Sequence, residues 1–141
     1  MLKIRRSGKS DQNTILDLLR EIDLHFASQS LENFWVAEKH GRIIGVVQFE
    51  EFANFYFLSS LGVVENERKN RVAAALLQEI LRDARKDVYL YTIIPDFFTR
   101  FGFKIVPAPD FLPAKKPFCM ECYPDKCVTM VRNPTIVGKP A

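Results

Sequence analysis

The chain has 141 residues, a formal net charge of +3 and 48% hydrophobic residues. This length suits one domain with a full core, so we expect a single domain over residues 1–141. The small charge and the scattered basic residues argue against nucleic acid as a partner. Because no apolar run is long enough for a membrane span and residues 1–7 lack the apolar segment of a signal peptide, a cytoplasmic location is expected.

The first half of the chain predicts a strand, a helix and a three-stranded meander. The helix is expected to begin after an N-cap at Ser10 or Asp11, and residues 25–31 to form a second short helix or a loop. Turns are expected at His40-Gly41 and at residues 53–54. The expected strands cover residues 2–6, 34–39, 42–51 and 55–64.

Residues 58–81 predict a buried strand, a polar turn and an amphipathic helix from Arg71 to about residue 85. Asn70 is expected to cap this helix by accepting from an N–H near Ala73. Free N–H groups at a helix start attract anions, and Arg68 and Lys69 add positive charge there. The stretch therefore predicts a site for a phosphate-bearing cofactor. The apolar stripe of the helix consists of Ala73, Leu76, Leu77, Ile80, Leu81 and Ala84.

The second half predicts a strand at residues 88–93, a short helix from Pro95 to near Gly102, and a strand at residues 103–106. A strand–helix–strand crossover makes strands 55–64 and 88–93 parallel neighbours. Residues 107–127 form a loop rich in proline and cysteine, and residues 127–132 a last strand. Burial is expected for Phe111, Leu112 and Phe118.

Two segments carry a resemblance to a known family. Residues 60–64 (Ser-Leu-Gly-Val-Val) and 68–73 (Arg-Lys-Asn-Arg-Val-Ala) resemble the acetyl-CoA-binding motif of the GNAT superfamily of N-acetyltransferases. Arg68 matches the first position of that motif and Ala73 the last, but Lys69 and Arg71 stand where the family often has glycine. Residues 95–103 (Pro-Asp-Phe-Phe-Thr-Arg-Phe-Gly-Phe) resemble the later helix of the superfamily.

The resemblance implies an α/β fold with a mixed, mostly antiparallel central sheet, flanking helices and a splayed parallel strand pair in the middle. It also implies acetyl-CoA as co-substrate, with its pantetheine arm paired to the earlier of the two strands. Gly62 is expected to allow a bulge or a close approach there. The expected cofactor-binding residues are Leu61, Gly62, Val63, Arg68, Lys69, Asn70, Arg71, Val72, Ala73, Phe97 and Phe98.

The implied reaction is acetyl transfer to the amine of a small molecule. The amine must lose a proton to a base, and a backbone N–H at residues 61–63 would stabilise the thioester oxygen. The family's usual glutamate base and its thiolate-protonating tyrosine fall at Phe57 and Phe98 here. Tyr91 is therefore the expected catalytic residue, although a buried structural tyrosine is the alternative. The candidates for a substitute base are Glu50, Glu51 and a water held by Ser59 or Ser60.

Other residues leave alternatives open. By resemblance, Asp23, His25 and Phe26 would touch the acceptor, although His25 and Phe26 can equally pack or face solvent. A structural zinc needs four ligands, so the three thiols of Cys119, Cys122 and Cys127 predict no metal site. A redox dithiol or simple packing remain the alternatives. This tail also resembles the stand-alone N-acetylglutamate synthase branch, which makes glutamate one candidate acceptor.

Two further classes of function compete with the enzyme. One is a non-catalytic acyl-CoA-binding regulator, and the other is a small interaction domain in which Lys69 and Arg71 close the cofactor loop. The expected partner is a small-molecule amine, without nucleic acid or membrane. A homodimer formed at an exposed late strand is also consistent with the pattern.

Overall fold

The structure is a computed structural model that describes residues 2–25, 29–113 and 127–134. The described strands form one sheet with the order β1-β2-β3-β4-β5-β7-β6. Their bounds are β1 Leu2–Arg6, β2 Phe34–Lys39, β3 Arg42–Glu51, β4 Phe55–Val63, β5 Asp87–Thr92, β6 Lys104–Val106 and β7 Val128–Arg132. The helices are α1 Gln12–Glu21, α2 Val72–Leu81 and α3 Pro95–Thr99, with 3-10 turns η1 Lys9–Asp11 and η2 Glu65–Asn70.

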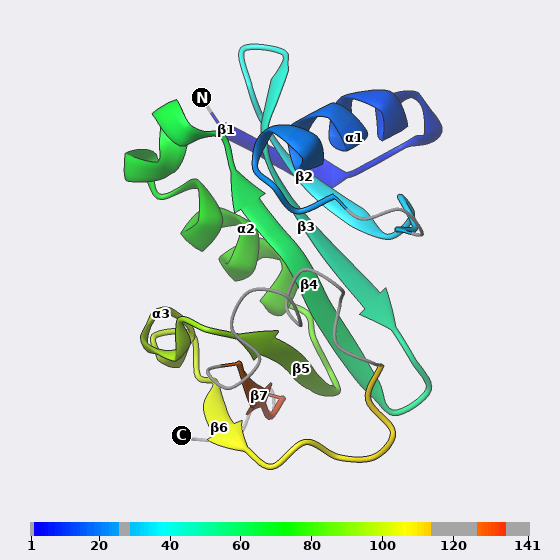
Figure 1. The fold of residues 1–141 in the computed structure, drawn as a ribbon, viewed down its shortest axis with the longest axis vertical. Helices are drawn as coiled ribbons and strands as arrows, with labels where there is room; N and C mark the ends of the chain where they lie inside the picture. The colour runs from blue at the N-terminus through cyan, green and yellow to red at the C-terminus, as the bar shows by residue number, and fades with distance from the viewer. Residues whose placement is uncertain (1, 26–28, 114–126, 135–141) are drawn as a thin grey trace.

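The sheet has one parallel neighbour pair among the described strands, β4 and β5, and the other neighbours are antiparallel (Figure 1). The parallel pairing covers Phe55↔Asp87, Tyr56↔Val88 and Phe57↔Tyr89. Because β4 continues to Val63 and β5 to Thr92, the two strands separate beyond these pairs. This confirms the mixed sheet with a splayed parallel pair, joined by a crossover through α2.

The long helices cover opposite faces of the sheet, as the positions of two glycines show. A Cβ on Gly45 would lie 2.9 Å from Val72 Cγ1 at the start of α2, whereas a Cβ on Gly62 would overlap Ile22 Cδ1, just after α1. Gly62 pairs with Val46, the neighbour of Gly45, so the two contacts lie on opposite faces. We call these the α1 face and the α2 face, and Figure 1 shows the sheet between the two helices.

Both predicted amphipathic helices bury their apolar stripes. Helix α1 buries Ile15, Leu18 and Leu19. Helix α2 buries Val72, Leu76, Leu77, Ile80 and Leu81. The predicted stripe is confirmed except at its first position, where Val72 is buried and Ala73 is half-buried. No helix in the described part of the chain is long and apolar enough to cross a membrane.

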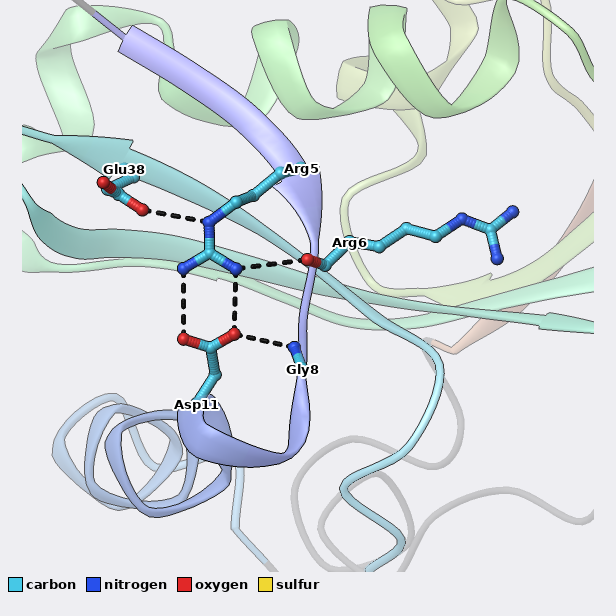
Figure 2. A network of polar contacts seen from close by, with 5 residues as sticks. All are labelled: Arg5, Arg6, Gly8, Asp11 and Glu38. Carbon is cyan, nitrogen blue, oxygen red and sulfur yellow. Dashed lines mark hydrogen bonds and ion pairs between the residues drawn. The ribbon is translucent and has the colours of Figure 1, made fainter.

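Asp11 connects η1 and α1 to the first strand rather than capping α1. Arg5 donates to both of its carboxylate oxygens, with Nη1–Oδ2 at 2.8 Å and Nη2–Oδ1 at 3.0 Å, and Gly8 N donates at 2.7 Å (Figure 2). Arg5 Nε also donates to Glu38 on β2 at 3.0 Å. Asp11 stands at the N-cap of α1 but makes no side-chain bond to the helix, so the expected capping bond is wrong. The bidentate bond to arginine takes its place.

The element boundaries differ from the expected ones by a few residues. The turn at His40 and Gly41 is confirmed by φ values of 53° and 75°. Helix α2 runs from Val72 to Leu81, which is shorter than expected because its last residues form an exposed turn. Phe111 is 59% exposed, so its expected burial is wrong. Its ring instead lies at the rim, against Phe55, while Leu112 is half-buried and Phe118 lies outside the described residues.

Candidate functional site

The candidate site is the opening between β4 and β5. Its narrow end lies just beyond the last parallel pair, Phe57↔Tyr89. There, on the α1 face, the ring of Phe57 packs edge-on against that of Tyr91 with centroids 5.2 Å apart. Phe57 is 1% exposed. The point where the strands separate is therefore filled by aromatic rings, and the backbone of β4 beyond residue 57 has no β5 partner among the described pairs.

The part of β4 that borders this opening contains a bulge. The register shift places Ser60 and Leu61 opposite Val47 alone, and Ser60 has a φ of 52°. The expected bulge therefore exists, but it is centred on Ser60 rather than Gly62. Gly62 instead permits a close approach by Ile22 from the α1 face. A bulge redirects the backbone groups around it, and here it acts on the stretch that the family resemblance assigns to the thioester oxygen.

The wide end of the opening meets an uncapped start of α2. The first intrahelical bond runs from Ala75 N to Arg71 O at 3.1 Å, so the N–H groups of residues 72–74 have no partner within the helix. The expected cap by Asn70 is wrong, because Asn70 Nδ2 donates to Glu67 Oε1 at 2.7 Å. That bond is the largest cause of the lowered pKa of Glu67. The helix start is therefore available to an anion.

Arg71 holds the conformation for which the motif has a glycine. Its φ of 61° is left-handed, and it is the N-cap of α2. A non-glycine residue there costs roughly 1 kcal/mol. The chain thus keeps the backbone geometry of the motif although the glycine is replaced, and the side chain of Arg71 is exposed.

Positive charge gathers around this helix start. Arg68, Lys69 and Arg71 are all exposed. Arg68 Nε donates to Val63 O at 3.0 Å, so this residue also ties the loop to the end of β4. The structure therefore brings together the residues of β4, η2 and α2 that were expected to bind the cofactor.

The expected residues on α3 lie on the other side of β5. Phe98 is 5% exposed and packs edge-on against Phe97 and Phe103. Its ring belongs to the hydrophobic core, whereas Phe97 is half-buried. Pro95 occupies the first turn of α3 as expected.

Tyr91 is half-buried, and its hydroxyl donates to Pro113 O at 2.5 Å. Burial raises its pKa, and the nearby Cys127 adds to the effect. The phenol is therefore protonated at neutral pH. Its catalytic role stays a prediction, since the same bond also anchors the segment that follows Phe111.

Polar side chains on the α1 face connect the sheet to the segment after α1. Gln48, which is 3% exposed, donates through Nε2 to Ser30 O at 3.1 Å and to Glu32 O at 2.9 Å. Ser59 Oγ donates to Gln48 Oε1 at 3.3 Å. Gln29 Nε2 donates to Ser60 Oγ at 3.2 Å. Sequence reasoning missed both glutamines, although a glutamine inside the apolar run of residues 43–49 was a signal of a buried polar role.

The remaining expected residues are placed as follows. Asp23 is exposed with a φ of 60°, His25 is half-buried, and Phe26 lies outside the described residues. Glu51 points to the α2 face and accepts from Lys86 Nζ at 2.6 Å, which is the main cause of its lowered pKa. Within the described residues, no group of three or more potential metal ligands is clustered. Cys119 and Cys122 lie outside those residues, and Cys127 is half-buried.

A mixed sheet that splays beside an uncapped, cationic helix start is the architecture of an acyl-CoA-dependent acetyltransferase domain. The family model of the acetyltransferase (GNAT) domain matches residues 30–105. The chain therefore belongs to the GNAT family, as the motifs predicted. A comparison with curated protein sequences gave no match.

Solved structures share the fold at low identity. N-acetylglutamate synthase from Neisseria gonorrhoeae, complexed with coenzyme A and N-acetyl-glutamate, is 19% identical with a TM-score of 0.76 over 96% of this chain. The match spans 36% of that protein. PaiA N-acetyltransferase from Thermoplasma acidophilum, complexed with coenzyme A, is 14% identical with a TM-score of 0.68 over 94% of this chain and 99% of its own. Arabidopsis thaliana Naa50, complexed with the bisubstrate analogue CoA-Ac-MVNAL, is 13% identical with a TM-score of 0.68, over 94% and 98% of the two chains.

Proposed function

We propose that this protein transfers the acetyl group of acetyl-CoA to the amine of a small molecule. The observation that carries the proposal is the position of the uncapped start of α2 at the wide end of the β4–β5 opening. The N–H groups of residues 72–74 and the exposed side chains of Arg68, Lys69 and Arg71 can hold phosphate groups there. The free edge of β4 can pair with an extended, amide-bearing chain such as pantetheine.

Three chemical steps follow from this placement. The ammonium of the acceptor gives a proton to a base, and the neutral nitrogen attacks the thioester carbon. Backbone N–H groups of residues 61–63, near the bulge, donate to the carbonyl oxygen as it gains negative charge. The C–S bond then breaks, and the thiolate takes a proton. Tyr91, whose raised pKa keeps it protonated, is the proposed donor.

The proposed acceptor is a small-molecule amine, and an amino acid such as glutamate is one candidate. Support comes from the similar fold of a synthase that was crystallised with N-acetyl-glutamate. A second fold relative carries an analogue joined to a peptide, so a peptide N-terminus belongs in the same screen. The acceptor panel therefore includes glutamate, other amino acids, simple alkyl and aralkyl amines, and a short peptide.

A non-catalytic acyl-CoA-binding regulator is the second candidate. Phe57 and Phe98 occupy the positions of the family's usual base and acid, and both rings are buried. A regulator would bind acetyl-CoA and leave the thioester intact. Turnover therefore separates the two functions.

The test begins with thermal unfolding of the full chain in the presence and absence of millimolar acetyl-CoA. A ligand at one hundred times its dissociation constant adds about 2.7 kcal/mol to the free energy of unfolding. We expect a clear upward shift for the wild type, a smaller shift for Lys69→Glu, and a wild-type shift for Lys104→Glu, an exposed control on β6. No shift for the folded wild type would contradict both acyl-CoA functions.

Release of CoA thiol is then measured with the amine panel, and the acetylated product is identified by mass spectrometry. Turnover supports the enzyme. Binding without turnover of any amine would instead support the regulator. Two further expectations stay proposals here, namely a cytoplasmic location and a homodimer. The edge strand β6, with Ile105 58% exposed, is the proposed dimer contact, and light scattering after size exclusion tests it.

A further inference from the structure

A carboxylate lies directly across from the position where the expected base is missing. Glu50 on β3 pairs with Phe57 on β4. Directly opposite residues of antiparallel strands point to the same face, with Cβ atoms about 4.5–5.5 Å apart. Glu50 therefore lies on the α1 face, one strand away from the position that carries the base in the family pattern.

The surroundings of Glu50 place it beside the candidate reaction centre. It shares its face with Gln48, two residues earlier on β3, and with Ser59 on β4, which hydrogen bonds to Gln48. Phe57, its cross-strand partner, packs against Tyr91 at the point where β4 and β5 separate. Gln48 also fixes residues 30–32 over this part of the sheet. Glu50 itself is half-buried in this wall.

Glu51 offers an internal comparison. It is the next residue on β3, points to the α2 face and is bonded to Lys86. Glu50 has no hydrogen bond or ion pair with any residue in the described ranges. Its carboxylate is therefore available to a cationic ligand, whereas the carboxylate of Glu51 is already paired.

We propose that Glu50 accepts the proton of the acceptor ammonium, so that the base acts from β3 instead of β4. This inference rests on the proposed acetyl transfer. One ammonium proton passes to the carboxylate of Glu50, directly or through one water, and the nitrogen lone pair forms the C–N bond. The C–S bond breaks, a second proton leaves the nitrogen and ends on the CoA sulfur, and Glu50 returns its proton to solvent.

The test compares Glu50→Gln, Glu50→Asp and Glu51→Gln with the wild type, using acetyl-CoA and an amine that the wild type acetylates. We expect Glu50→Gln to lower kcat/KM by at least about 10²-fold, Glu50→Asp to retain an intermediate rate, and Glu51→Gln to keep the wild-type rate. The thermal shift with acetyl-CoA should be the same for all four proteins. This last result would show that the variants are folded and bind the co-substrate.

A matched pair of acceptors separates a base from a structural residue. A β,β-difluorinated analogue has nearly the shape of its parent amine but is largely neutral at the assay pH, so it needs less help from a base. We expect the loss in Glu50→Gln to be much smaller for the analogue than for the parent amine. Equal losses, or a Glu50→Gln rate within about twofold of the wild type, would overturn the assignment of Glu50 while leaving acetyl transfer intact. Failure of the wild type to acetylate any amine would overturn both proposals.

Discussion

Gly62 of β4 and Ile22, the residue that follows α1, are in such close contact that no side chain fits between them. A Cβ at position 62 would overlap Ile22 Cδ1 and lie 3.1 Å from Leu24 Cδ1. Because Gly62 belongs to the stretch expected to bind the cofactor, this contact sets how closely the segment after α1 approaches the opening. The glycine therefore serves the packing of the acceptor side.

Gly62→Ala should lower the free energy of unfolding by about 1–3 kcal/mol, since the new methyl group displaces Ile22 or moves the strand. Chemical denaturation measures the change. The double variant Gly62→Ala with Ile22→Val removes the colliding Cδ1 atom and should recover part of the loss. Gly8→Ala is the control, because a Cβ there has its nearest neighbour, Asp11 Oδ2, at 3.8 Å. Additive effects of the two changes would contradict the contact.

Arg71→Gly should raise the free energy of unfolding by about 1 kcal/mol, because residue 71 has a left-handed φ of 61°. The matched variant is Lys69→Gly, which removes the same charge from an exposed residue within η2. Glycine should there lower stability by roughly 0.5–1 kcal/mol. Thermal unfolding gives both values, and a loss of stability in Arg71→Gly would show that strain at this residue is unimportant.

The bond between Arg5 and Asp11 should make stability depend on acid pH. Hydrogen bonds from Arg5 and from Gly8 N lower the pKa of Asp11 from 3.8 to about 2. A folded-state pKa below the unfolded one stabilises the protein above about pH 4, and this contribution is lost as the pH falls toward 2. Asp11→Asn should therefore lower stability by about 1 kcal/mol at neutral pH, with a smaller difference from the wild type near pH 2.

Denaturation of both proteins at several pH values measures this difference. The control is Asp17→Asn, because Asp17 is an exposed residue of α1. We expect that control to follow the wild type over the whole range. A difference between Asp11→Asn and the wild type that stays constant down to pH 2 would contradict the linkage.

Tyr91→Phe distinguishes a catalytic tyrosine from a structural one. Loss of the bond to Pro113 O should lower stability by about 1 kcal/mol. If Tyr91 also protonates the leaving thiolate, kcat should fall by about 10²-fold while the thermal shift with acetyl-CoA persists. Tyr89→Phe, on the same face, should keep its kcat. A stability loss with an unchanged kcat would assign Tyr91 to structure.

Local sequence patterns predicted most of the fold. The apolar stripe of α2 and the alternation in β2 and β3 depend on periodicity, which is a property of neighbouring residues. The short crossover then required β4 and β5 to be parallel, because such a connection cannot form a hairpin. The family motifs identified the place of the cofactor site for the same reason, since they occupy contiguous stretches.

The wrong predictions concern contacts between distant segments. Nothing near Gly62 in the sequence shows that Ile22 packs on it. Asp11 looks like a helix cap until β1 brings Arg5 within reach. Asn70 failed as a cap because the left-handed residue after it turns the chain, and arginine is an uncommon residue for that conformation. The importance of Glu50 depends on a cross-strand register that the sequence leaves open.

The short pairing between β4 and β5 gives the sheet a third edge, located in its middle. An outer edge accepts any strand, and proteins usually protect it. An edge inside a narrowing gap is more selective, because a partner must be thin, extended and able to offer an amide from one side. Hydrogen exchange of the β4 amides beyond Phe57 would therefore report occupancy residue by residue. Saturation with a ligand that completes the sheet should slow these amides and leave those of β1 unchanged.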